Sequence, residues 1–154
     1  MAAITPEVRI QTEDFDAAAE TARLTAGRPD IGAVVTFCGL CRSEDGRLAA
    51  LELEHYPGMA ETEIARIAAE AVSRWPVTGL TVVHRHGRIA AGGNIVLVVA
   101  TSSHRQAAFE AASFLMDFLK TRAPFWKREH LIDGAVGEWV AATAEDDAAQ
   151  ERWR

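Results

Sequence analysis

Four cationic side chains occur within nine residues in the last quarter of the chain, in the stretch Lys120-Thr-Arg-Ala-Pro-Phe-Trp-Lys-Arg128. Phe125 and Trp126 lie among them. A dry aromatic wall beside clustered cations lowers the pKa of a lysine through desolvation and like-charge repulsion. A neutral lysine can act as a base or a nucleophile. The alternative is a solvated run of cations that complements the C-terminus of a helix, which an ordinary lysine pKa for Lys120 would favour.

A second cationic pair, His104 and Arg105, follows two serines. Ser103, with Gln106 three residues later, has the pattern of a capping box and predicts that a helix starts here. Positive charge in the first turn of a helix is unfavourable, and a bound anion would relieve it because free backbone N–H groups converge there. The pair therefore indicates an anion site, unless both side chains simply point to solvent.

These two clusters cannot meet within one copy of the chain. His104 and Lys120 are sixteen residues apart on one predicted helix, which separates them by about 24 Å along its axis. A symmetric dimer could bring His104 of one copy near Lys120 of the other. We therefore predict a homodimer with a shared pocket.

Both cysteines of the chain lie in Cys38-Gly-Leu-Cys41. They are too few for a disulfide framework. A zinc site would need two more ligands, for which His84 and His86 are candidates, but a single C-x-x-C is a weak signal for zinc. A persulfide-carrying cysteine is a further alternative. We expect two small buried side chains, no metal and no cofactor.

Size and composition limit the class of protein. A chain of 154 residues, 49% hydrophobic and 25% charged, is typical of one soluble globular domain over residues 1–154. The net charge of −6 argues against a nucleic-acid binder. No apolar run approaches the roughly 20 residues that span a bilayer, and the start lacks the pattern of a signal peptide. A cytoplasmic protein with no membrane association is expected.

Hydrophobic spacing predicts the elements that position these residues. Helices are expected over about 14–26, 59–75 and 103–122, with a short one over 143–153. Strands are expected over 31–40, 49–56, 80–89, 94–101, 125–131 and 136–141. Short turns at 43–46, 91–93 and 133–134 join neighbouring strands, which should therefore pair antiparallel. The predicted fold class is α+β, with antiparallel sheets and packed helices.

Several segments together resemble the large, catalytic subunits of molybdopterin synthase, the MoaE family. They are Gly32–Phe37 with Gly39 and Arg42, Leu53–Met59, Arg74–Pro76, Val83–Arg85 with Gly87, Thr101–Arg105 and Phe114–Glu129. The resemblance spans about residues 31–139, and its last segment, FLMDFLKTRAPFWKRE, is long and specific. It implies an α/β-hammerhead fold.

The resemblance also implies a function, a sulfurtransferase in molybdenum cofactor biosynthesis. Such a protein forms a homodimer at the centre of a heterotetramer, and each copy binds one ubiquitin-like small subunit. The Gly-Gly C-terminus of that subunit, as a thiocarboxylate, is expected to enter a pocket of this protein. Cyclic pyranopterin monophosphate would receive two sulfurs, which form a dithiolene while its cyclic phosphate opens.

The family's functional residues fall on positions of this chain that match its motifs. The resemblance places the essential lysines on Lys120 and Lys127, the pocket lining on Phe37, Arg42 and Met116, and an anion-binding pair contributed across the dimer on His104 and Arg105. Lys120 is the candidate for acid/base or transient covalent work. Lys127 would hold a carboxyl end or a phosphate as a point charge.

Two departures from the family pattern bear on the site. The family commonly has an arginine after Trp-Val-x-Ala, whereas Thr143 follows Trp139-Val-Ala-Ala here. The C-x-x-C is not part of the pattern, so the cysteines are expected to be dispensable. Taken without the resemblance, the residues equally fit a non-catalytic docking module for a ubiquitin-like protein, or a lyase or isomerase of a phosphorylated metabolite.

Overall fold

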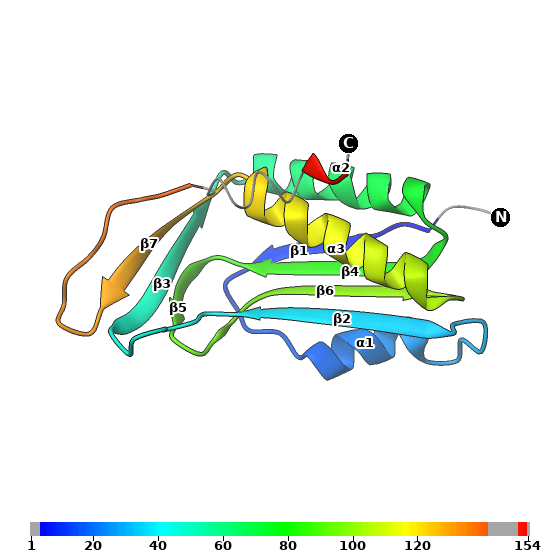
Figure 1. Ribbon diagram of the computed structural model, residues 1–154, viewed down its shortest axis with the longest axis horizontal. Helices are drawn as coiled ribbons and strands as arrows, with labels where there is room; N and C mark the ends of the chain where they lie inside the picture. Colours follow the sequence, from blue (N-terminus) through cyan, green and yellow to red (C-terminus); the bar gives the residue numbers. More distant parts are fainter. Residues whose placement is uncertain (1–3, 142–150, 154) are drawn as a thin grey trace.

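Two sheets of different size make up the framework of the chain, which a computed structural model describes over residues 4–141 and 151–153 (Figure 1). The four-stranded sheet has the order β1-β4-β6-β2 and the three-stranded sheet the order β5-β3-β7. The α+β class predicted from the sequence is confirmed. The strands are β1 (Glu7–Gln11), β2 (Ala33–Leu40), β3 (Leu48–His55), β4 (Val77–Arg85), β5 (Gly87–Ala90), β6 (Asn94–Ser102) and β7 (Phe125–Leu131), and the helices are α1 (Ala17–Thr25), α2 (Met59–Arg74) and α3 (Arg105–Thr121).

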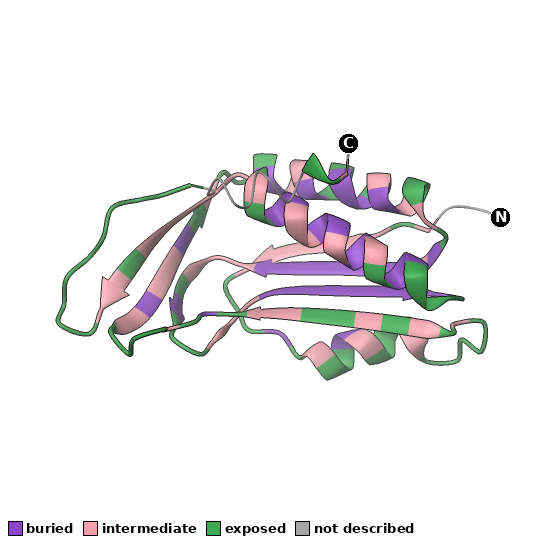
Figure 2. Cartoon of the chain, in the orientation of Figure 1, coloured by how far each residue is buried: buried purple, intermediate pink, exposed green. Residues whose placement is uncertain are grey.

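Helices cover both faces of the larger sheet, as Figure 1 shows. Because successive strand residues point to opposite faces, Leu80 and Val82 of β4 pack with α2 and α3, whereas Val83 packs with Phe15 and Leu24 near α1. The central strands β4 and β6 are therefore buried along almost their whole length, which Figure 2 shows as two purple strands. The described helices include none long and apolar enough to cross a membrane.

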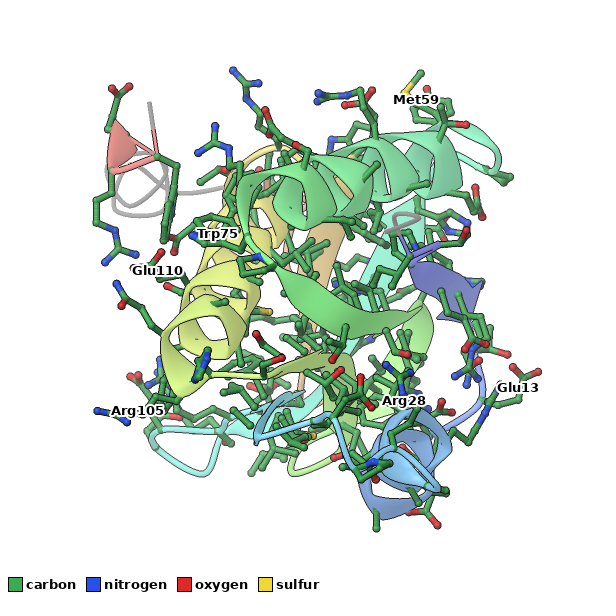
Figure 3. All side chains as sticks on the ribbon, turned by 90° about the vertical axis from the view of Figure 1, so that its right-hand side faces the viewer. Glu13, Arg28, Met59, Trp75, Arg105 and Glu110 are labelled. Atoms are coloured by element: carbon green, nitrogen blue, oxygen red, sulfur yellow. The ribbon has the colours of Figure 1, made fainter. Side chains whose placement is uncertain are left out.

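The C-terminal end of α2 is fixed against α3. Pro76 follows the last residues of the helix, and the residue before a proline is driven to extended backbone, which Trp75 adopts at φ −132° and ψ 149°. The indole N–H of Trp75 donates to the carboxylate of Glu110 on α3, and Figure 3 shows the two side chains together. This contact joins α2 to α3, whose far end carries Lys120.

The smaller sheet presents an apolar face to the rest of the chain. Leu53 packs with the buried Ile89 of β5 and with Cys41. Glu52, on the opposite face, accepts from Arg128 Nε and His130 Nε2, each at 2.8 Å. This alternation, visible in the sequence of β3, leaves its leucines to form one wall of a cavity.

Three expectations about the strands were wrong. The segment β1 was not predicted, and it pairs in parallel with β4, so the larger sheet is not wholly antiparallel. The segment 80–89 is not one strand, because Gly87 adopts φ +86° and turns the chain into β5 of the other sheet. The strands β2 and β3 do not pair, because Cys41 N–H donates to Gly93 O and directs the chain away from β2.

The start of α3 also differs from its prediction. Ser103 and Gln106 form no capping box: His104 is the N-cap without a side-chain hydrogen bond, and Gln106 donates to Glu110 instead. The reason is that β6 stays paired through Ser102, which moves the start of the helix one residue along. The second predicted hairpin is partly confirmed, since residues 136–141 make two isolated bridges to β7 rather than a strand. The predicted helix over 143–153 lies mostly outside the described residues.

Candidate active site

A cavity of about 340 Å³ lies where the end of α3 meets the smaller sheet. Its walls are largely apolar, from Leu51 and Leu53 of β3, Met116 and Leu119 of α3, and Phe125 of β7. Its polar lining includes His84, Lys120 and Lys127. A largely apolar pocket of a few hundred cubic ångströms with a few convergent polar groups is the usual form of a small-ligand site.

The two lysines come from adjoining elements. Lys120 lies in the last turn of α3, which ends at Thr121 and is capped by Arg122, whose N–H donates to Phe118 O. The chain then turns at Ala123 and Pro124 into β7. Lys127 is fixed there by paired backbone hydrogen bonds with Val140, at 3.0 and 2.8 Å. Val140 and Ala141 thereby line the cavity on the side of Lys127.

The structure brings together only some of the predicted site residues. Lys120, Lys127 and Met116 line one cavity. Phe37 is 41% exposed on the edge strand β2, and it pairs with Val98 on the sheet face that α3 covers. Arg42 is exposed just beyond β2 and forms an ion pair with Glu44 at 2.7 Å. Neither Phe37 nor Arg42 lines the cavity.

The predicted anion-binding pair lies at the opposite end of α3 from Lys120. His104 and Arg105 are both exposed, and Figure 3 shows Arg105 projecting outward from the first turn of the helix. The uninterrupted helix of 17 residues keeps the two ends apart. At 1.5 Å per residue the separation of His104 and Lys120 is about 24 Å. The pair therefore cannot reach the cavity of its own copy.

The charge of the cavity lining favours an anionic ligand. The described residues around it include two lysines and no aspartate or glutamate. In a partly apolar site of reduced dielectric, positive charges attract an anion more strongly than they would in water. The lining thus has the charge expected for a phosphate or a carboxylate-like ligand.

His84 is the site residue that sequence reasoning missed as a cavity-lining group. It ends an apolar run on β4, is 7% exposed, and stacks on Phe125 with ring centroids 4.0 Å apart. Burial, opposed by a hydrogen bond to the Arg85 carbonyl, lowers the pKa of His84 from 6.5 to about 4. The signal in the sequence was a histidine that follows β-branched residues, on a strand with no solvent-exposed face.

This pKa predicts a pH-dependent stability. Unfolded His84 takes up a proton near pH 6.5, whereas folded His84 does so only near pH 4. The contribution of neutral His84 to the free energy of unfolding is therefore full above pH 6.5 and is lost as the pH falls toward 4. Between pH 7 and 5 the free energy of unfolding should drop by about 2 kcal/mol more in the wild type than in His84→Phe. Urea unfolding at both pH values measures this, and equal drops would show that His84 is not a buried neutral histidine.

The two cysteines occupy separate environments. Both are free; Cys38 Sγ donates to Asn94 Oδ1 at 3.4 Å, and Cys41 is buried beside Leu53 and Ile89. Burial raises the pKa of each thiol above its ordinary value, which disfavours the reactive thiolate. The described residues contain no group of three or more side chains able to hold a metal ion, so the zinc ligands that the sequence suggested do not converge.

Sulfur chemistry by these thiols is therefore not expected. In the sulfur-transfer reaction that the resemblance implies, the double variant Cys38→Ser, Cys41→Ser should keep its turnover rate within about 2-fold of the wild type, because neither thiol is activated. Burying a hydroxyl at position 41 should cost about 1–3 kcal/mol of stability. Steady-state turnover, with circular dichroism as the folding control, tests this. Loss of turnover in a folded double variant would show that a cysteine takes part.

Fold and cavity together define a class: an α+β protein with a cationic pocket for a small anionic ligand. Comparison with known proteins identifies the family, because a family model described as "MoaE protein" matches residues 10–122. A molybdopterin synthase catalytic subunit of Mesorhizobium japonicum is 69% identical over 153 residues, which covers 99% of this chain and 96% of that protein. The chain belongs to the MoaE protein family.

Solved structures agree with this assignment. The molybdopterin biosynthesis MoaE protein from Burkholderia ambifaria is 50% identical, with a TM-score of 0.82 over 96% of this chain and 97% of that chain. Molybdopterin synthase from Staphylococcus aureus is 28% identical, with a TM-score of 0.76 over 90% and 98% of the two chains. The resemblance noted from the sequence motifs is thus confirmed at the level of the family.

Proposed function

We propose that this chain, acting as one domain, is the catalytic subunit of a molybdopterin synthase. It would transfer sulfur from the thiocarboxylated C-terminus of a ubiquitin-like small subunit to cyclic pyranopterin monophosphate. The main structural support for the proposal is that Lys120 and Lys127 line one cavity, and that no described carboxylate lines it. Both the thiocarboxylate and the cyclic phosphate are anions that such a cavity would accept.

The two lysines divide the work in this proposal. Lys127 lies on a strand whose backbone is fixed on both sides, which suits a point charge that holds an anionic group in place. Lys120 lies in the last turn of α3 and would shuttle the proton or form a transient bond to the acyl carbon. When the C-terminal acyl group of the small subunit gives up its sulfur, water supplies the oxygen that converts this group to a carboxylate. Two thiocarboxylates are therefore consumed for each dithiolene.

A homodimer would complete the pocket, at the centre of a heterotetramer with two small subunits. His104 and Arg105 cannot reach the cavity of their own chain, so the proposal assigns them to the cavity of the partner copy. The edge strand β2 offers a contact surface, since no described strand pairs with its outer side and it exposes Val34, Phe37 and Leu40. Exposed edges with apolar side chains are ready templates for association. Phe37 and Arg42 would then join the substrate site, and Met116 would form its apolar wall.

The experiment that tests this function is a reconstitution from purified components. The chain is mixed with the thiocarboxylated small subunit and the cyclic pterin, and the dithiolene product is measured by mass spectrometry. The matched control uses the same small subunit with an ordinary C-terminal carboxylate, which carries no sulfur to transfer. Product only in the first mixture is the expected result.

Other outcomes point to other functions. Binding of the small subunit without any product would favour a non-catalytic docking module. A changed pterin in the mixture without thiocarboxylate would favour a lyase or an isomerase. The proposal includes a cytoplasmic location, which imaging of a tagged copy in cells would test.

A further inference from the structure

His84 stands out in the cavity because it is a buried polar lining group that the proposed reaction does not yet use. It follows Leu80 and Val82 on the face of β4 that α2 and α3 cover. Its register partner on β6 is Val96, which also lines the cavity. An imidazole at the inner end of this apolar face is costly to bury unless its polar atoms are used.

The hydrogen bonding of the ring fixes its tautomer. Nδ1 lies 2.8 Å from the carbonyl oxygen of Arg85. A carbonyl oxygen can only accept, so Nδ1 carries the proton and Nε2 has a free lone pair. The stacking on Phe125, with the ring planes 17° apart, fixes the orientation of the imidazole. Nε2 is therefore the polar atom of His84 that is left for the cavity.

Burial keeps His84 neutral, and the charged groups around it further oppose its protonation. They are Lys120 on α3, His55 on β3 and His86 beyond the end of β4, and each of them opposes a positive charge on the ring. No described acidic side chain lines the cavity. The ring therefore remains a hydrogen-bond acceptor at neutral pH, beside a lysine that can only donate when it is charged.

We propose that His84 is a positioning residue for Lys120: its unprotonated Nε2 accepts a hydrogen bond from the Lys120 amino group and turns the lone pair of the amine toward the ligand. This inference rests on the proposed function. A neutral amine has two N–H donors and one lone pair, so an acceptor on one side orients the lone pair to the other. When Lys120 takes up a proton, Nε2 goes on accepting, and the proton stays on the lysine.

A set of variants separates this role from a structural one. His84→Phe keeps the ring stacked on Phe125 but removes the acceptor, and His84→Gln can restore an acceptor at similar reach. The kcat of dithiolene formation should fall by about 10- to 100-fold in His84→Phe, since misplacing a catalytic group by an ångström has effects of this size. The KM values for pterin and small subunit should stay within about 2-fold. His84→Gln should recover part of the loss.

His86→Phe is the matched control, because His86 lies two residues along and does not line the cavity. It should leave kcat unchanged. A wild-type kcat in His84→Phe would overturn the proposal. So would a loss of the same size in His86→Phe, because the effect would then follow from disturbing the end of β4.

A second measurement needs no turnover and separates this proposal from the proposed function. Nitrogen-15 NMR of the free protein should show His84 protonated on Nδ1 only. Titration of Lys120 should give a lower pKa in His84→Phe than in the wild type, because the acceptor that stabilises the ammonium is gone. Protonation on Nε2, or an unchanged pKa of Lys120, would overturn the role of His84 even if the enzyme makes dithiolene. Failure of the wild type to make dithiolene would instead refute the function.

Discussion

Replacing Lys120 by alanine is expected to lower the kcat of dithiolene formation by about 100- to 10,000-fold, the range typical of a lost general acid or base. Lys120 lies at the surface end of α3, so the substitution should not disturb the core. Lys120→Arg should be as inactive as Lys120→Ala, because a guanidinium keeps the charge but does not release its proton near neutral pH. Steady-state turnover with saturating small subunit measures both.

The control for Lys120 is Arg122→Ala, which removes an exposed cation two residues away that does not line the cavity. It should retain full activity. Thermal unfolding of all three variants shows whether the fold is kept. If Lys120→Arg were active, the lysine would act only through its charge, and the acid/base role would have to be abandoned.

Substitution of Arg105 by alanine is expected to raise the KM for the cyclic pterin by about 10- to 100-fold with little change in kcat. The reason is that a hydrogen bond to a charged group contributes about 1.5–3 kcal/mol, and Arg105 would bind the phosphate rather than the reacting atoms. The exposure of Arg105 and its position at the start of α3 argue against a role in folding. Initial rates over a range of pterin concentrations measure the effect.

The control for Arg105 is Arg66→Ala, which also removes one exposed positive charge but from an ion pair with Glu63 on α2. It corrects for the change in net charge of the protein. A change of KM in both variants would indicate long-range attraction of the substrate instead of a contact. Raising the salt concentration would then abolish the difference between them.

The fold was predictable where the hydrophobic spacing is strong and the pairing local. The helices α2 and α3 and the strands β2 and β3 lie within two residues of their expected bounds. The spacing did not reveal β1, because its five residues gain stability only by pairing in parallel with β4, some 70 positions further along. The spacing also predicted β4 and β5 as one strand. The reason is that the positive φ of Gly87, which directs the chain into the other sheet, cannot be recognised from the sequence.

The candidate site was predictable to a similar degree. Lys120 and Lys127 of the predicted cation cluster line the same cavity as Phe125 and Trp126. The contribution of β3 and β4 to the same cavity could not be seen, because it depends on how the two sheets are placed against each other. His84 was considered only as a metal ligand, although it lines the cavity.

The central claim is that one substrate site is formed by Lys120 of one copy and Arg105 of the other, and a mixed dimer tests it most directly. Lys120→Ala and Arg105→Ala chains carrying different affinity tags are co-expressed, and the heterodimer is purified through both tags. In a shared site, one of its two pockets contains both substitutions and the other contains none. Turnover is measured at a pterin concentration where each homodimeric variant is nearly inactive.

The account predicts that this heterodimer recovers about half of the wild-type turnover per dimer, because one pocket is intact. If each pocket were built from a single chain, every pocket of the heterodimer would carry one substitution and no activity would return. A heterodimer as inactive as its parents would therefore contradict the shared site.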